Sequence, residues 1–331
     1  MPRQLMEYHP VLGHRYIPAV KLRVPHESGG YLLQTNGLGF RSHHDFEPSR
    51  PASKRRVLLF GDSFTAGDGV SNSLRYSDVL EGLRPDLEVY NFGLPGSGTD
   101  QQYLAWREFA QDLEADQVVL AFQPENLRRN ASRYKLYRDP AGQQACYAKP
   151  FFTLQDGQLV IGHQPVPRGP RSMADLEGAA RVDTDGMRFK ALRRIINALG
   201  LKEIALKVTR FQPLPEYDDP RHPDWLLTRA ILLDWISKVR GPVTLLFVPL
   251  WYHLDGSVDA SHVQARLREL ALEASATLID PLPELLALPA DTRRGFRFAK
   301  DPHPTPAYHR ALAAILSRDL LRGDYAGREG D

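Results

Sequence analysis

The sequence predicts an α/β protein in which a parallel sheet lies between layers of helices. Short apolar runs alternate along the chain with stretches that carry apolar residues at helical spacing. Two of these runs end directly in glycine and other small turn residues, as buried parallel strands do. Strands that alternate with helices form βαβ units, and such sheets bind ligands at the carboxyl ends of their strands. The residues that follow the apolar runs are therefore where chemistry is expected.

The alternation can be followed from residue 57 to residue 321. Strands are predicted at 57–60, 87–92, 117–122, 243–249 and 277–279, and helices at 76–83, 99–113, 188–199, 224–239, 263–274 and 307–321. Thr99 is the predicted N-cap of the second of these helices.

Two segments depart from this rhythm. Residues 1–50 are rich in Pro, Gly and His without periodicity, and we interpret them as an irregular N-terminal arm or lid. Residues 51–325 form the predicted α/β domain. Within it, residues 130–185 are interpreted as an insertion over one edge of the sheet, with a hairpin around Asp156-Gly157.

Composition excludes several classes of protein. The 42 basic residues nearly balance the 40 acidic ones, without the basic clustering of a nucleic-acid-binding surface. One cysteine, Cys146, excludes an intrachain disulfide framework and a cysteine-rich metal site. No apolar run is long enough to span a bilayer, and no secretory signal is recognisable, so a cytoplasmic location is expected.

A serine follows the first apolar run, in Gly61-Asp62-Ser63-Phe64-Thr65. At such a turn a hydroxyl projects into the crevice beside free backbone N–H groups that can stabilise an oxyanion. The alternative of equal weight is that Ser63 caps a helix. The segment is not the Gly-x-Ser-x-Gly elbow of α/β-hydrolases, because position 65 is Thr.

Two further segments follow the second and third runs. Residues 91–99 contain three glycines within six positions and enter a helix, which suits an incoming anion but also an ordinary strand-to-helix turn. The third run is followed by Asn126 and Asn130, whose amides could point into the same crevice or bond their own backbone.

A carboxylate and an imidazole lie close together near the end of the chain, in Asp301-Pro302-His303. A stiff loop can present both groups to one point, where His303 takes a proton and Asp301 fixes its tautomer. A metal site or a plain surface loop is the alternative for an isolated Asp-x-His. His309 lies on the following helix face and is interpreted as structural or exposed.

In combination, these segments resemble the SGNH (GDSL-like) hydrolase family. Residues 61–65 match its first block, 91–96 its second, and 301–303 its last, in the family's order along the chain. The third block departs, because the family's Gly-x-Asn-Asp reads Gln-Pro-Glu-Asn over 123–126.

The resemblance implies a flavodoxin-like three-layer α/β/α sandwich and hydrolysis of an acyl ester through an acyl-serine. Ser63 would be the nucleophile, His303 the base and Asp301 its orienting partner. The oxyanion hole would consist of the Ser63 N–H, the Gly96 N–H and the Asn126 amide, with Asn130 as the second candidate for that amide. No metal or organic cofactor is implied.

The substrate expected from the resemblance is a small acyl ester, such as an acetyl group on a saccharide. An aromatic and basic set of side chains in and directly before the insertion would suit a carbohydrate, although a solvated surface is an equal interpretation of it: Arg129, Arg133, Tyr134, Lys135, Tyr137, Arg138 and Tyr147. An O-acyltransferase with the same triad and a catalytically impaired carbohydrate-binding relative are the alternatives. Neither nucleic acid nor a membrane is an expected partner.

Overall fold

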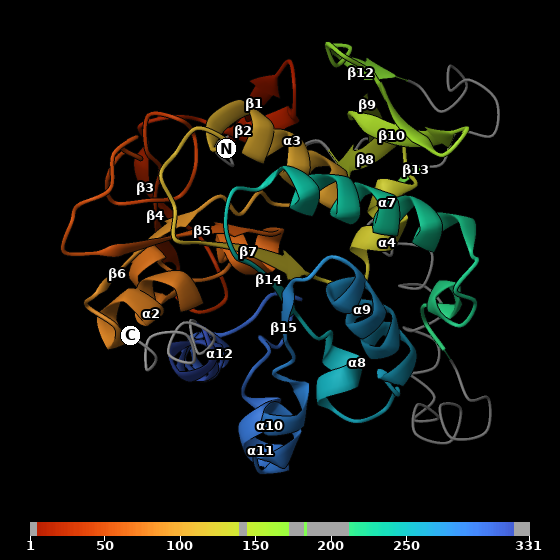
Figure 1. The fold of residues 1–331 in the computed structure, drawn as a ribbon. Helices are drawn as coiled ribbons and strands as arrows, with labels where there is room; N and C mark the ends of the chain where they lie inside the picture. Colours follow the sequence, from red (N-terminus) through yellow and green to blue (C-terminus); the bar gives the residue numbers. More distant parts are fainter. Residues whose placement is uncertain (1–4, 139–143, 172–181, 184–211, 321–331) are drawn as a thin grey trace, which may run out of the picture.

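The computed structural model describes residues 5–138, 144–171, 182–183 and 212–320 (Figure 1). The helix predicted at 188–199 lies outside the described residues. Every other predicted strand and helix is present, with ends that differ by a few residues.

The centre of the fold is a five-stranded parallel sheet. Its strands are β5 (Arg55–Phe60), β6 (Leu87–Asn91), β7 (Gln117–Phe122), β14 (Val243–Phe247) and β15 (Thr277–Ile279). They are ordered β15-β14-β7-β5-β6, and all neighbours are parallel. The first strand of this sheet along the chain, β5, is internal; β6 lies on one side of it, and β7, β14 and β15 follow in order on the other. This is the flavodoxin-like strand order, with its topological switch point between β5 and β7. Binding is expected at the carboxyl ends of these two strands.

Helices cover both faces of the sheet. On one side α2 (Tyr76–Leu83) packs against α12 (Pro306–Asp319). On the other, α3 (Thr99–Phe109) packs against α7 (Pro223–Lys238), and α9 (Ser261–Glu273) contacts β14 and β15. Figure 1 shows the two helix pairs on opposite sides of the central strands. The prediction of a three-layer α/β/α sandwich is therefore confirmed.

The remaining elements are short and connect or flank these layers. They are α1 (Ser63–Ala66), η1 (Asn72–Leu74), α4 (Asn126–Asn130), η3 (Pro215–Tyr217), α8 (Trp251–Leu254), α10 (Leu282–Ala287) and α11 (Ala290–Arg294).

The predicted N-cap of α3 is wrong by one residue. Gly98 is the N-cap, and Thr99 is the first helical residue. The side-chain oxygen that caps this helix comes from another element, because Oδ1 of Asn130 accepts a hydrogen bond from the Asp100 N–H at 3.1 Å. A tertiary contact thus replaces the local cap that the sequence favours.

The N-terminal segment is more regular than its composition predicts. It contains two antiparallel hairpins, β1 (Met6–His9) with β2 (Gly13–Tyr16), and β3 (Lys21–Val24) with β4 (Tyr31–Gln34). The description of residues 1–50 as irregular is therefore wrong for this part. Apolar side chains of these hairpins form a small cluster with Ala66 of α1, so the segment packs on the turn that follows β5.

The insertion forms a second sheet. It consists of β8 (Tyr134–Arg138), β9 (Gln144–Ala148), β12 (Pro170–Arg171) and β13 (Val182–Asp183) in the order β12-β9-β8-β13. The predicted hairpin is confirmed as β10 (Phe151–Gln155) and β11 (Gln158–Gly162), joined by Asp156-Gly157.

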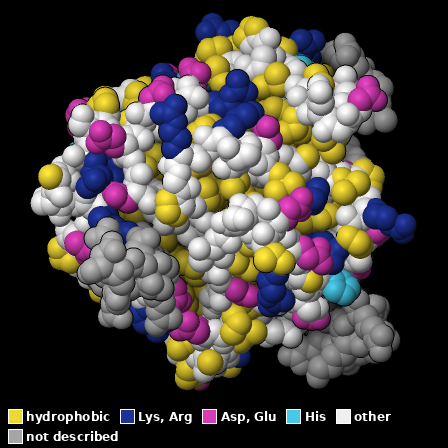
Figure 2. All heavy atoms as spheres, viewed as in Figure 1, with side chains coloured by type: hydrophobic (Ala, Val, Ile, Leu, Met, Phe, Trp, Pro, Cys, Tyr) yellow, Lys and Arg dark blue, Asp and Glu magenta, His cyan; other side chains and the backbone are white. Residues whose placement is uncertain are grey.

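Charged side chains of both signs are interspersed over the face of the molecule in Figure 2, in keeping with the balanced composition. Among the described residues, no helix combines the length and the apolar character that crossing a membrane requires.

Candidate active site

Ser63 lies at the carboxyl end of β5, one of the two strands at the topological switch point of the sheet. It is the first residue of α1, which begins directly after β5, and the residue as a whole is only 7% exposed. Asp62 is the N-cap, and its Oδ1 accepts from the Phe64 N–H at 3.0 Å. The alternative that Ser63 is merely a helix cap is therefore wrong. As a first-turn residue, Ser63 has a backbone N–H without an acceptor inside its helix.

Asp301 and His303 form a tightly bonded pair. Oδ1 of Asp301 accepts from Nδ1 of His303 at 2.6 Å and from the His303 backbone N–H at 2.8 Å. This fixes the ring with Nδ1 as donor and leaves Nε2 as the nitrogen that can take a proton. The ring centroid lies 5.9 Å from that of Phe64, the residue after Ser63. The fold thus places the His303 ring beside Phe64, 239 positions away in sequence. The described residues show no hydrogen bond between the Ser63 hydroxyl and His303.

The surroundings of His303 raise its pKa. Burial acts to lower its pKa, but the Asp301 hydrogen bond and the nearby carboxylates outweigh burial and raise the pKa above its ordinary value. One of these carboxylates belongs to Asp68, whose Oδ2 lies 3.9 Å from Nε2 of His303. Burial likewise acts to raise the pKa of Asp301, but its bonds with His303 lower the pKa to about 2. Asp301 is therefore ionised at neutral pH.

Asn126 presents an unsatisfied donor. Its side chain is fully buried, and Oδ1 accepts from Nη1 of Arg129 at 2.9 Å. That bond orients the amide, and the buried Nδ2 has no hydrogen-bond partner in the described structure. The same Nη1 donates to Oδ2 of Asp62 at 2.7 Å, so Arg129 ties Asn126 to the residue before Ser63. A buried amide without a partner is costly, and a bound oxyanion would satisfy it.

Asn130, the second candidate, is engaged elsewhere. Besides capping α3 through Oδ1, it donates from Nδ2 to Oγ1 of Thr228 at 3.0 Å. Both ends of this amide are therefore used in holding helices together.

The loop around Gly96 is held by side chains from outside the sheet. Nε2 of His14 bonds the Pro95 carbonyl at 2.8 Å, and Nζ of Lys135 bonds the Gly96 carbonyl at 2.8 Å. In a trans peptide the C=O and N–H point in opposite directions, so anchoring the Pro95 carbonyl directs the Gly96 N–H away from His14. Gly96 has φ of +65°, which favours glycine, and a Cβ there would collide with Nζ of Lys135 and force that side chain to move.

Two residues of the basic and aromatic set, Arg129 and Lys135, are buried and support the site, whereas the sequence left carbohydrate binding and a solvated surface as interpretations. Arg129 bonds Asp62 and Asn126, and Lys135 bonds the Gly96 loop. His309 is also buried, and its Nδ1 accepts from the Tyr76 N–H at 3.2 Å, which confirms a structural role. Arg129 and Lys135 bond residues that are distant in sequence, Asp62 and Gly96. Such contacts leave no pattern in the local sequence, so the sequence alone could not distinguish these buried residues from exposed basic ones.

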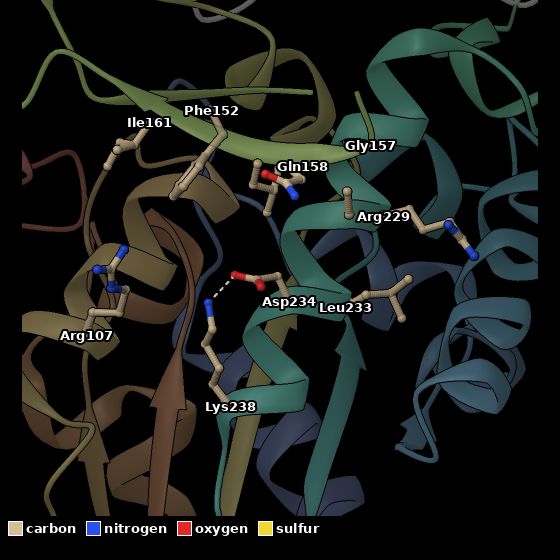
Figure 3. Close-up of a pocket in the computed structure, with 11 residues that line it drawn as sticks. Arg107, Phe152, Gly157, Gln158, Ile161, Arg229, Leu233, Asp234 and Lys238 are labelled. Atoms are coloured by element: carbon tan, nitrogen blue, oxygen red, sulfur yellow. Dashed lines mark hydrogen bonds and ion pairs between the residues drawn. The ribbon is translucent and has the colours of Figure 1, made fainter. Parts of the chain in front are cut away.

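A cavity of about 580 Å³ lies away from these residues (Figure 3). Phe152 and Ile161 of the β10–β11 hairpin face Arg107 of α3 and Asp234 of α7 across it. Asp234 pairs with Lys238 at 2.7 Å, and none of the predicted site residues lines the cavity. Within the residues that the structure describes, no cluster of three His, Cys, Asp or Glu side chains is close enough to hold a metal ion. The Asp301 and His303 side chains are instead hydrogen-bonded to each other.

Comparison with known proteins gives similarity to solved structures alone. No family model matches the chain, and no curated protein matches it. A member of the lipolytic G-D-S-L family from Veillonella parvula is 14% identical over 81% of this chain and 99% of its own, with a TM-score of 0.43. A lipase/acylhydrolase from Enterococcus faecalis is 15% identical over 80% and 95%, with a TM-score of 0.42. An acetylxylan esterase from Geobacillus stearothermophilus is 15% identical over 80% and 94%, with a TM-score of 0.41.

Proposed function

We propose that this protein is a serine esterase that hydrolyses small acyl esters through an acyl-Ser63 intermediate. Three features around the turn after β5 support the proposal. Ser63 is nearly buried at a helix start, and the His303 ring, bonded to Asp301 at 2.6 Å, lies with its centroid 5.9 Å from that of Phe64. Asn126, whose buried Nδ2 has no partner among the described residues, is linked through Arg129 to Asp62.

The proposed reaction has two steps. His303 accepts the Ser63 proton at Nε2 as Oγ attacks the ester carbonyl carbon, and the tetrahedral oxyanion receives hydrogen bonds from the oxyanion hole. His303 then gives that proton to the leaving alcohol, and the C–O bond breaks. In the second step water attacks the acyl-serine with His303 as base, releasing the carboxylic acid and restoring Ser63. Asp301 keeps Nδ1 protonated and stabilises the imidazolium in both steps.

The test is reaction with a fluorophosphonate probe together with turnover of p-nitrophenyl acetate. We expect the probe to modify the peptide that contains Ser63, identified by mass spectrometry, and to abolish turnover in proportion to labelling. Labelling of a different serine, or turnover that survives full labelling, contradicts the proposal. Added acceptor alcohol distinguishes a transferase, because acyl transfer to the alcohol would then exceed hydrolysis.

Replacing Asn126 by alanine is expected to lower kcat by about 10²–10³-fold with little change in KM, because one oxyanion donor is lost. Steady-state kinetics on p-nitrophenyl acetate measure this. Asn130→Ala is the matched control: it removes the contacts with Asp100 and Thr228, so it should lower the melting temperature and leave kcat of the folded protein near wild type. The opposite pattern would make Asn130 the oxyanion residue.

The pH profile of kcat/KM is expected to rise through a midpoint above about 6.5, because only neutral His303 can accept the serine proton and its pKa is raised. Asp68 contributes to that raised pKa through its charge. Asp68→Asn should therefore move the midpoint to lower pH while activity at high pH is retained. An unchanged midpoint in this variant would show that another group sets the acid limb.

We further propose that the alcohol part of the ester is a saccharide. Tyr137 and Tyr147 pack edge to face and are 36% and 39% exposed, which offers aromatic surface to a sugar ring. The Tyr137 ring centroid lies 5.5 Å from Nζ of Lys135, which bonds the Gly96 carbonyl. The measurement is the ratio of kcat/KM for an acetylated sugar to that for a simple alkyl acetate. Tyr137→Ala should lower this ratio, and an unaffected ratio contradicts the assignment.

A further inference from the structure

A second histidine approaches the side of Asp301 that His303 leaves free. His26 lies between β3 and β4 in the N-terminal segment, and its side chain is 8% exposed. Its ring packs edge to face against Phe298, with centroids 4.6 Å apart, and against Tyr31 at 5.8 Å. These contacts direct Nε2 to 3.5 Å from Oδ2 of Asp301.

The tautomer of His26 follows from its other nitrogen. The backbone N–H of Ser28 donates to Nδ1 of His26 at 3.2 Å. A backbone N–H can only donate, so this bond requires Nδ1 as an acceptor without a proton, and the Ser28 hydroxyl, whose Oγ lies 2.8 Å from Nδ1, can then donate to the same nitrogen. The neutral ring therefore has its proton on Nε2, the nitrogen that faces Asp301. This buried Nε2–H has no hydrogen-bond partner among the described residues.

The loop that carries Asp301 is held by the residue next to His26. Oε1 of Glu27 accepts from the backbone N–H groups of Lys300 at 2.9 Å and of Asp301 at 2.6 Å. His26 and Glu27 thus approach the same residue from one strand connection, one at its side chain and the other at its backbone. Gly69 leaves room for this approach, since a Cβ there would lie 2.9 Å from the Phe298 ring and 3.4 Å from Nε2 of His26.

We propose that His26 is a positioning residue for the Asp301–His303 pair. Its Nε2–H holds Oδ2 of Asp301, so that Oδ1 stays directed at Nδ1 of His303 while the imidazolium forms and discharges. The separation of 3.5 Å is longer than a good hydrogen bond, and contacts of this kind shorten when substrate fills the site. The N-terminal segment is then a part of the active site and not a cover over it. The inference rests on the proposed esterase function.

Two substitutions separate donation from packing. His26→Phe keeps an aromatic ring between Tyr31 and Phe298 but has no N–H, whereas His26→Gln supplies an amide N–H without the ring. We expect His26→Phe to lower kcat by about 10–100-fold with KM nearly unchanged, because a misdirected base costs about this much. His26→Gln should recover most of the loss. If His26 only fills space, His26→Phe will match the wild type and His26→Gln will be the weaker enzyme.

A double-mutant cycle identifies the group through which His26 acts. In the Asp301→Asn background, His26→Phe should cause little further loss, because the carboxylate that His26 positions is already gone. Additive losses of kcat in the double variant would overturn the proposal. Wild-type kinetics for both His26→Phe and His26→Gln would overturn it as well. Melting temperatures identify any variant that fails to fold, and the remaining variant and the cycle then decide. An inert wild type with unlabelled Ser63 would instead contradict the esterase function itself.

Discussion

Replacing Ser63 by alanine is expected to lower kcat for p-nitrophenyl acetate by about 10⁶-fold, the loss typical when the nucleophile of a serine triad is removed. Without Oγ no acyl-enzyme forms, and only the oxyanion donors and general binding remain to accelerate attack by water. The fold should be preserved, because Asp62 and not Ser63 caps α1. The melting temperature is therefore expected to stay close to that of the wild type.

The matched control for this substitution is Ser73→Ala. Ser73 is an exposed serine in η1, so the same chemical change is made outside the site. Its kinetics should equal those of the wild type. A Ser63→Ala protein with more than about one thousandth of wild-type kcat would mean that turnover does not pass through this hydroxyl, since a missing triad nucleophile costs far more than that.

Replacing Asp301 by asparagine is expected to lower kcat by about 10⁴-fold. The amide keeps the size of the carboxylate but removes the charge that stabilises the His303 imidazolium, and its NH₂ group favours the wrong tautomer. Asp301 raises the pKa of His303 more than any other group does. Its replacement should therefore lower that pKa and move the acid limb of kcat/KM to lower pH. The backbone bonds from Lys300 and Asp301 to Glu27 do not involve this side chain, so the loop should remain in place.

Asp68→Asn is the control for this second substitution. Asp68 also lies close to His303, but its Oδ1 accepts from the Tyr16 hydroxyl at 2.8 Å and neither oxygen bonds Nδ1 of His303. Its loss should shift the pH profile without a large loss of kcat. Equal kcat losses in the two variants would contradict the role of Asp301 as the orienting group and leave only a general effect of negative charge.

Local sequence determined the strands and most helices of the sandwich. The apolar run 57–60 and the helical spacing over 76–83 correspond to β5 and α2, because burial on both faces of a strand or one face of a helix leaves a periodic record. Ser63, Asp301 and His303 were also recognisable, since each follows or precedes an element in a short fixed pattern. The N-terminal hairpins were not, because their four-residue strands alternate too briefly among Pro, Gly and His to leave such a pattern.

By itself, then, the sequence determined the layers of this protein and the three residues of its candidate triad. Only the tertiary structure decided what orients them. Both ends of the Asn130 amide are hydrogen-bonded, whereas Nδ2 of Asn126 has no partner among the described residues. Arg129 and Lys135 are buried and bond Asn126 and the Gly96 carbonyl, and Nε2 of His26 lies 3.5 Å from Oδ2 of Asp301. The physical reason is that periodicity records whether a side chain faces the core, whereas a contact between residues 275 positions apart depends on the folding of the whole chain.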